Sequence, residues 1–185
     1  TARDGSGRWR RRNSDQAQAL EDALDRCGDS PLGGLAPQSV RRAPALRADL
    51  RALAGAHWET NLALLPSALA YAQRIATAAD VDHGAGLIGH AYTRYLGDLN
   101  GGQVLKRLLA RRMQLGPEAL SFYQFPGIDD LARFAADDRA RIDGLGARMP
   151  AASARIVEEA RASFAASIAI SLQVAEEGSH KRLSL

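Results

Sequence analysis

Three glycines and two charged side chains gather in one segment near the middle of the chain. Gly97 and Gly101 are four residues apart, so in a helix they share one face, a turn apart. Gly102 beside them forms a glycine pair, a common place for a helix to kink. Arg94 and Asp98 have the same spacing and can pair. A carboxylate next to a bare strip of helix backbone can order water over a ligand that lies on the strip.

Spacing alone leaves two interpretations of this segment open. The glycines allow either the close packing of a second helix or the contact of a flat ligand with the backbone. Arg94 and Asp98 form either a solvated ion pair, worth about a few tenths of a kcal/mol, or part of a polar site to which Tyr92 adds a phenol. Each glycine inside a helix costs about 1 kcal/mol relative to alanine, so three of them call for a compensating role.

The elements that must position this segment are helices. The chain holds 36 Ala and 24 Leu against 10 aromatic residues, and neither a strand pattern nor an internal repeat is present in the sequence. We expect a long connection rich in proline and glycine over 29–44, and helices over 14–27, 46–55, 66–80, 86–113, 129–145 and 151–177. The sequence therefore predicts an all-α fold in a single domain, with the 86–113 helix kinked at its glycines.

Composition excludes several classes of protein. The 185 residues suffice for one domain with a full core. Cys27 is the single cysteine, which excludes an internal disulfide framework and a multi-cysteine zinc site. The sequence shows no apolar run of about 18 residues and no signal-peptide pattern, so we expect a cytoplasmic protein with no membrane partner. The net charge of +3 is spread along the chain, and we expect no nucleic-acid partner. A basic arm remains the alternative, formed by Arg8, Arg10, Arg11 and Arg12.

The segment 90–106 reads HAYTRYLGDLNGGQVLK and resembles the signature of the heme oxygenase family, with Asn100 where serine is usual. Further stretches resemble the family in its order along the chain. They are Ala19-Leu20-Glu21, RAPAL at 42–46 with Asp49-Leu50, the G-x-x-W of 55–58, FYQFPGI at 122–128, and Arg139 after that turn. The resemblance runs from about residue 19 to residue 177.

The resemblance implies an all-α single domain that holds heme between a proximal and a distal helix. The distal helix is the glycine-kinked segment. The implied reaction is the oxygen-dependent opening of heme, which is both substrate and cofactor, to biliverdin, carbon monoxide and ferrous iron. It consumes dioxygen and external electrons, which come from a separate donor such as a ferredoxin or a flavin reductase.

The resemblance also assigns roles to individual residues. Asp98 anchors a distal water network that delivers protons to bound dioxygen, and Arg94 is a member of that network. The other site residues contact the heme: the backbone of Gly97 and Gly101 lines it, and Tyr92 and Arg139 meet its propionates, which a guanidinium suits.

One feature of the family is not found in this sequence. The family binds the heme iron through a histidine on its first helix, upstream of the matching segments, and residues 1–18 neither contain a histidine nor resemble that helix. We assign no metal ligand to the remaining histidines, which are His57, His83, His90 and His180. We expect an irregular Arg-rich leader over 1–18, a heme-oxygenase-like domain over 19–177 and a tail over 178–185. The chain is then either an N-terminally truncated heme oxygenase or a non-catalytic helical binding module of the same fold that has lost heme ligation.

Overall fold

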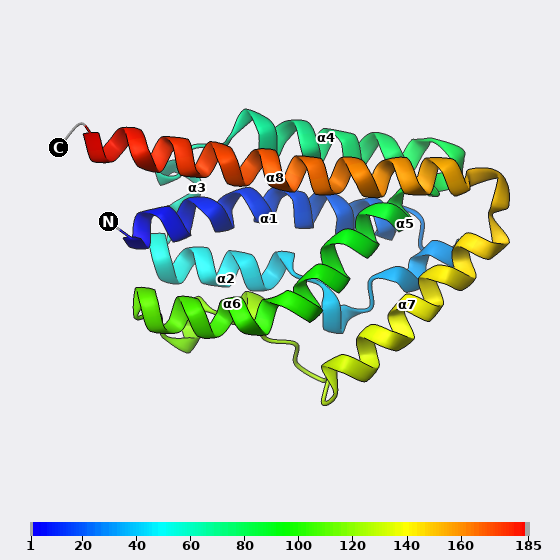
Figure 1. The fold of residues 1–185 in the computed structure, drawn as a ribbon, viewed down its shortest axis with the longest axis horizontal. Helices are drawn as coiled ribbons and strands as arrows, with labels where there is room; N and C mark the ends of the chain where they lie inside the picture. Colours follow the sequence, from blue (N-terminus) through cyan, green and yellow to red (C-terminus); the bar gives the residue numbers. More distant parts are fainter. Residues whose placement is uncertain (1, 184–185) are drawn as a thin grey trace.

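Long helices lie side by side in this protein and carry the shorter elements between them (Figure 1). The computed structural model describes the backbone of residues 2–183 and the side chains of residues 13–176. No strand occurs in that backbone, so the predicted all-α fold is confirmed. The main elements are α1 (Ala2–Arg26), α2 (Ala43–Ala54), α3 (Trp58–Asn61), α4 (Pro66–Asp80), α5 (Gly86–Ala91), η4 (Tyr92–Leu96), α6 (Gly97–Met113), α7 (Leu131–Arg148) and α8 (Ser153–Leu183).

Helix α1 lies at the centre of this arrangement and contacts α2, α4 and α8 (Figure 1). Apolar side chains at helical spacing bury its inner face, so that Leu20 and Leu24 are almost completely shielded from solvent. They join a core to which α4 contributes Ile75 and α5 contributes Leu87 and Ile88. The core therefore packs directly beneath the segment that leads into α6.

Buried acidic residues set where other helices and turns begin. Glu21 of α1 accepts hydrogen bonds at Oε1 from the backbone N–H groups of Arg42 (2.6 Å) and Ala43 (3.0 Å), at the start of α2. Asp49 of α2 accepts from the N–H groups of Ser121 (2.7 Å) and Phe122 (3.0 Å). Carboxylates at such N-termini satisfy donors that have no partner inside the helix. The connection before α2 and the 121–125 segment are thereby fixed to α1 and α2.

The glycine-containing helix is bent, but its widened turn lies just before Gly97, Gly101 and Gly102, the glycines at which the sequence predicts the kink. Residues Tyr92–Leu96 form a single widened π-helical turn between α5 and α6. Such turns interrupt the regular hydrogen-bond ladder and redirect a helix. Figure 1 shows the chain leaving α5 obliquely and turning near the start of α6 to follow the long axis of the molecule.

Part of the expected leader and part of the expected tail are helical in the described backbone. Helix α1 starts at Ala2 rather than after residue 18, and α8 continues to Leu183, beyond the expected end at residue 177. Arginine has almost the helix propensity of alanine, so an Arg-rich stretch extends a helix that packing has nucleated. The side chains of the proposed basic arm (Arg8, Arg10, Arg11, Arg12) and of His180 lie outside the described residues. Within the described residues, no helix is long and apolar enough to cross a bilayer.

Candidate functional site

The strip of backbone at Gly97 and Gly101 is open. Both glycines are exposed, and a Cβ atom built on either would have no heavy atom of the described structure within 4 Å. Close helix packing occurs instead at Gly89 of α5, where an added Cβ would lie 2.5 Å from the Ile156 carbonyl oxygen of α8. The open space at Gly97 and Gly101 therefore favours contact with a ligand. The glycine at which two helices pack closely is Gly89, two turns earlier.

Apolar side chains continue the open strip along α6. Val104, Leu105 and Leu108 follow Gly101 by three, four and seven residues and so share its face of the helix. They are 60%, 44% and 45% exposed, so an exposed apolar surface continues from the glycines along α6. They lie within the helix that the sequence predicts over 86–113, but the sequence analysis did not assign them to the site. Their spacing relative to the glycines was the signal that could have done so.

Asp98 lies beside this strip as a half-buried carboxylate. Burial raises the pKa of Asp98 to about 6, while the positive charges of Arg94 and Arg42 act in the opposite direction. A carboxyl group that titrates in this range can hold or release a proton near neutral pH.

Arg94 is not the direct partner of Asp98. Its Nη2 donates a hydrogen bond of 2.9 Å to Oδ1 of Asn13, a residue of α1 that is 81 positions away in the sequence. Of the two interpretations of this spacing, the solvated ion pair with Asp98 is not found among the described residues, and Arg94 instead makes a contact that ties η4 to α1. Arg94 still acts on Asp98 through its charge.

The two residues expected at the propionates are both accessible. Tyr92 is 39% exposed on η4, and Arg139 is exposed on α7. The elements that carry them, η4 and α7, contact each other.

His90 is a structural residue in this fold. It is fully buried, with Nε2 3.2 Å from Oε2 of Glu159 and Nδ1 3.4 Å from the hydroxyl of Tyr71. Burial holds the pKa of His90 below its usual range. His57 and His83 are exposed, and the described residues contain no group of three or more His, Cys, Asp and Glu side chains that could hold a metal ion.

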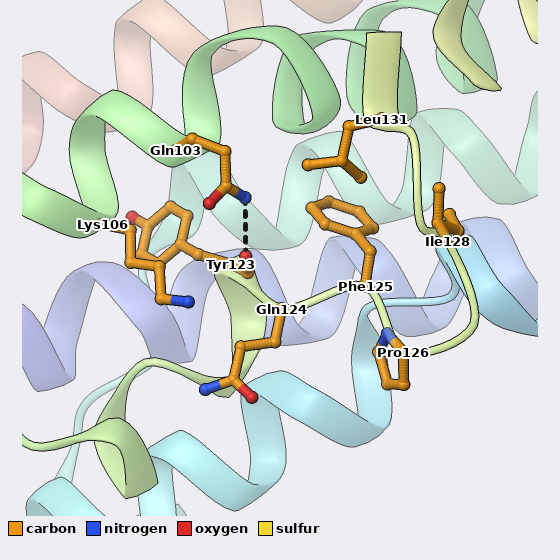
Figure 2. A pocket seen from close by; sticks show the side chains of 8 residues that line it. All are labelled: Gln103, Lys106, Tyr123, Gln124, Phe125, Pro126, Ile128 and Leu131. Carbon is orange, nitrogen blue, oxygen red and sulfur yellow. Dashed lines mark hydrogen bonds between the residues drawn. The ribbon is translucent and has the colours of Figure 1, made fainter. Parts of the chain in front are cut away.

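The opposite side of α6 is held by the 121–125 segment. Figure 2 shows Gln103 reaching from α6 to the backbone of Tyr123, where its Nε2 donates to the carbonyl oxygen at 2.8 Å. The Tyr123 ring also lies 3.2 Å from the position that a Cβ on Gly102 would take. Gln103 and Tyr123 border a shallow cavity of about 450 Å³ (Figure 2). The other residues that line it are Lys106, Gln124, Phe125, Pro126, Ile128 and Leu131. Among the side chains of residues 13–176, these contacts on one side of α6 leave the Gly97–Gly101 face free.

Comparison with known proteins identifies the family. The sequence model of the heme oxygenase family matches residues 13–173, which span α1 to α8 and include the whole site. The chain belongs to the heme oxygenase family. Among curated heme oxygenases, it is 36% identical to heme oxygenase 1 of Rattus norvegicus over 150 residues, which cover 79% of this chain and 51% of the relative. It is also 36% identical to heme oxygenase 1 of a Nostoc strain over 148 residues, covering 79% of this chain and 61% of the relative.

Solved heme oxygenases share the fold. The crystal structure of heme oxygenase-2 from Synechocystis sp. PCC 6803 in complex with heme and NO has a TM-score of 0.85 and 28% identity, covering 94% of this chain and 72% of that one. Heme oxygenase-1 from the same cyanobacterium, in complex with heme, has a TM-score of 0.81 and 27% identity, covering 99% of this chain and 82% of that one. This heme oxygenase homologue spans about half the length of several curated relatives that it matches.

Proposed function

We propose that this protein is a heme oxygenase, which opens heme with dioxygen and external electrons to give biliverdin, carbon monoxide and ferrous iron. The observation that carries the proposal is the open Gly97–Gly101 strip with the Asp98 carboxyl beside it. Both lie within the part of the chain that matches the family.

The described residues fit the distal face of a heme site. A flat macrocycle can approach the helix backbone only where side chains are missing, and the Gly97–Gly101 strip meets that requirement. The exposed side chains of Val104, Leu105 and Leu108 offer apolar contact along the same face. Heme, when bound, supplies the redox chemistry of the reaction.

Polar residues around the strip have separate tasks in this proposal. Asp98 holds a proton or a water at the edge of the strip, since its pKa lies near 6. Arg94, fixed by Asn13, supplies a positive charge that keeps Asp98 available as a carboxylate. Tyr92 and Arg139 are accessible donors for the propionates. Electrons come from a separate cytoplasmic donor, such as a ferredoxin or a flavin reductase.

Heme binding and turnover test the proposal separately. Hemin is titrated into the 185-residue chain and into the longest form of the protein that its gene encodes, and the Soret band is followed. A reductase, its electron source and oxygen are then added, and biliverdin is measured. Biliverdin formation by the longest form supports the proposal, and its absence despite heme binding supports the non-catalytic binding module. The specific observation behind that alternative is that His57, His83 and His90 are exposed or engaged elsewhere.

Replacing Asp98 tests its role in proton delivery. Asp98→Ala should leave hemin binding within about twofold, because the strip is intact, and should lower the rate of biliverdin formation by about 100-fold, as expected for the loss of a positioned proton donor. Asp129→Ala removes an exposed carboxylate in the loop before α7 and serves as the control. An unchanged biliverdin rate in Asp98→Ala removes Asp98 from this role.

A further inference from the structure

Arg42 is a buried cation at the start of α2, and backbone carbonyl oxygens surround it. It is 4% exposed. Its guanidinium donates to the carbonyl oxygens of Val40 (Nε, 2.9 Å), Ser39 (Nη2, 2.9 Å), Phe122 (Nη1, 3.1 Å) and Gln124 (Nη1, 2.5 Å). The Phe125 ring covers it at 4.2 Å from the guanidinium carbon to the ring centroid.

This guanidinium satisfies its donors without a carboxylate. In the part of the chain that the structure describes, no carboxylate oxygen lies within 4.0 Å of a guanidinium nitrogen of Arg42, the limit for an ion pair. Arginine keeps its charge in proteins, so Arg42 carries a buried positive charge that carbonyl dipoles hold but do not neutralise. Burying such a charge is costly, and its field extends beyond its hydrogen-bond partners.

The backbone brings Arg42 and the distal carboxylate to the same side of α6. Gly102 lies four residues after Asp98 on the same helix face, and a Cβ on Gly102 would lie 3.2 Å from the ring of Tyr123. Arg42 binds the carbonyls on either side of Tyr123, so its charge lies on the side of α6 that Asp98 faces.

Asp98 and Glu21 are the carboxylates whose charges act on Arg42, and Arg42 in turn acts on Asp98. The positive charge of Arg94 on η4 also lowers the pKa of Asp98. The negative charge of Asp98 in turn raises the pKa of two phenols, Tyr71 on α4 and Tyr95 on η4. Asp98 is therefore influenced by one cation from its own bent helix, Arg94, and by a second, Arg42, at the residue just before α2.

The same guanidinium fixes the support of α6. It binds the carbonyls of Phe122 and Gln124, and Gln103 of α6 binds the carbonyl of Tyr123 between them. Arg42 from one side and Gln103 from the other thus hold three consecutive carbonyls of one short segment. Arg42, the residue just before α2, and α6, which carries Asp98, are therefore joined through this segment.

We propose that Arg42 is a positioning residue of the distal site: it supplies the second positive charge that keeps Asp98 ionised, at a place fixed by the carbonyl cradle it forms with the 122–125 segment. Its consequence for catalysis rests on the proposed function. The electrostatic link itself concerns only residues of this chain, and it is tested on the protein without heme.

Titration of the Asp98 carboxyl measures this link. The ¹³C signal of the carboxyl group, assigned by its absence in Asp98→Asn, is followed from pH 4 to pH 8. Arg42→Gln, whose amide still reaches one carbonyl, should move the midpoint of the Asp98 titration upward by about one pH unit, because a nearby opposite charge typically lowers a carboxyl pKa by at least that much. Arg42→Lys keeps the charge and should keep the midpoint within about 0.3 unit.

Arg41→Gln is the matched control. Arg41 is the adjacent arginine, but it pairs with Asp25 and the Ala36 carbonyl and does not act on Asp98. This variant should leave the Asp98 midpoint unchanged. An unchanged midpoint in folded Arg42→Gln, or an equal shift in Arg41→Gln, overturns the proposal.

A measurement on the unmodified protein covers the case in which Arg42→Gln does not fold. The ¹⁵Nε resonance of Arg42 should shift with the midpoint of the Asp98 titration, and Asp98→Asn should abolish that inflection. The corresponding resonance of Arg41 should show no inflection at this midpoint. If the Arg42 resonance does not follow Asp98, the two groups are not coupled and the proposal fails without any change to the cradle.

Discussion

At the scale of single residues, the raised pKa of Asp98 makes the free energy of unfolding depend on pH. Burial raises the pKa to about 6, against about 3.9 for an aspartate in an unfolded chain. Between these values the folded protein binds more protons at this site than the unfolded chain, so the free energy of unfolding falls as the pH rises from about 4 to about 6. The ionised site is thus maintained at a cost to the fold, as is common where chemistry requires it.

This cost predicts the behaviour of Asp98→Asn. The variant should be about as stable as the parent protein at pH 4 and about 2 kcal/mol more stable at pH 8, because it never has to bury the charge. Denaturant unfolding at both pH values measures the difference. Asp129→Asn removes one exposed negative charge and controls for the change in net charge. A stability difference that stays constant from pH 4 to pH 8 would show that Asp98 is not buried as a charge.

The candidate site residues that the sequence predicts are those with local signals. Gly97, Gly101 and Asp98 are recognisable from spacing and from the family signature, and the structure places them together on one helix. Arg42 was not found as an electrostatic partner, because only the folded chain brings it to the 122–125 segment, 80 residues away. The same holds for the contact between Arg94 and Asn13, since the sequence presents Asp98 as the obvious neighbour of Arg94.

At the scale of elements, the glycines of α5 and α6 serve opposite purposes. An added Cβ on Gly89 would lie 2.5 Å from the Ile156 carbonyl oxygen and 2.6 Å from the Ala160 nitrogen, whereas one on Gly97 would meet nothing within 4 Å. Backbone atoms of α8 cannot move aside as a flexible side chain can. Packing against α8 therefore requires a glycine at position 89. No packing contact of the described residues requires one at position 97, where a bound ligand would.

Alanine substitutions separate these two purposes. Gly89→Ala should lower the free energy of unfolding by about 3 kcal/mol through overpacking. Gly97→Ala should raise it by up to about 1 kcal/mol through helix propensity, yet weaken hemin binding at least about tenfold, because the new methyl group fills the strip. Gly144→Ala in α7, where a Cβ also meets nothing within 4 Å, is the control for propensity alone and should leave hemin binding unchanged. Unchanged hemin affinity in Gly97→Ala would contradict the assignment of the strip.

Element boundaries were predictable wherever apolar periodicity and a terminal signal coincide. Pro66 opens α4 as expected, and α2 and α7 lie within a few residues of their predicted ranges. The first part of α1 was not predicted, because its sequence offers arginines and glycines rather than an apolar stripe. The short helix α3 was missed as well, and it is fixed by the burial of Trp58 against Leu50 and Leu62 rather than by a pattern of its own.

At the scale of the whole molecule, a buried polar cluster ties together helices that are far apart in the sequence. Glu159 of α8 accepts from Nε of Arg74 on α4 at 2.7 Å and lies 3.2 Å from Nε2 of His90 on α5. Tyr71 of α4 bonds to Ser163 of α8 and lies beside the same histidine. The cluster packs behind the start of the bent helix, so it fixes α5 while leaving α6 free to present its open face.

The two adjacent glutamates of α8 allow the cluster to be tested with its own control. Glu159 is 5% exposed and Glu158 is 60% exposed, and both face Arg74 and Arg155. Glu159→Gln should lower the free energy of unfolding by about 2 kcal/mol, a value below that of a fully buried pair because Arg74 is partly exposed. Glu158→Gln removes the same charge one residue away and should cost less than about 0.5 kcal/mol. An equal loss of unfolding free energy in the two variants would mean that only the net charge near the arginines matters. The buried cluster would then not be what holds α4, α5 and α8 together.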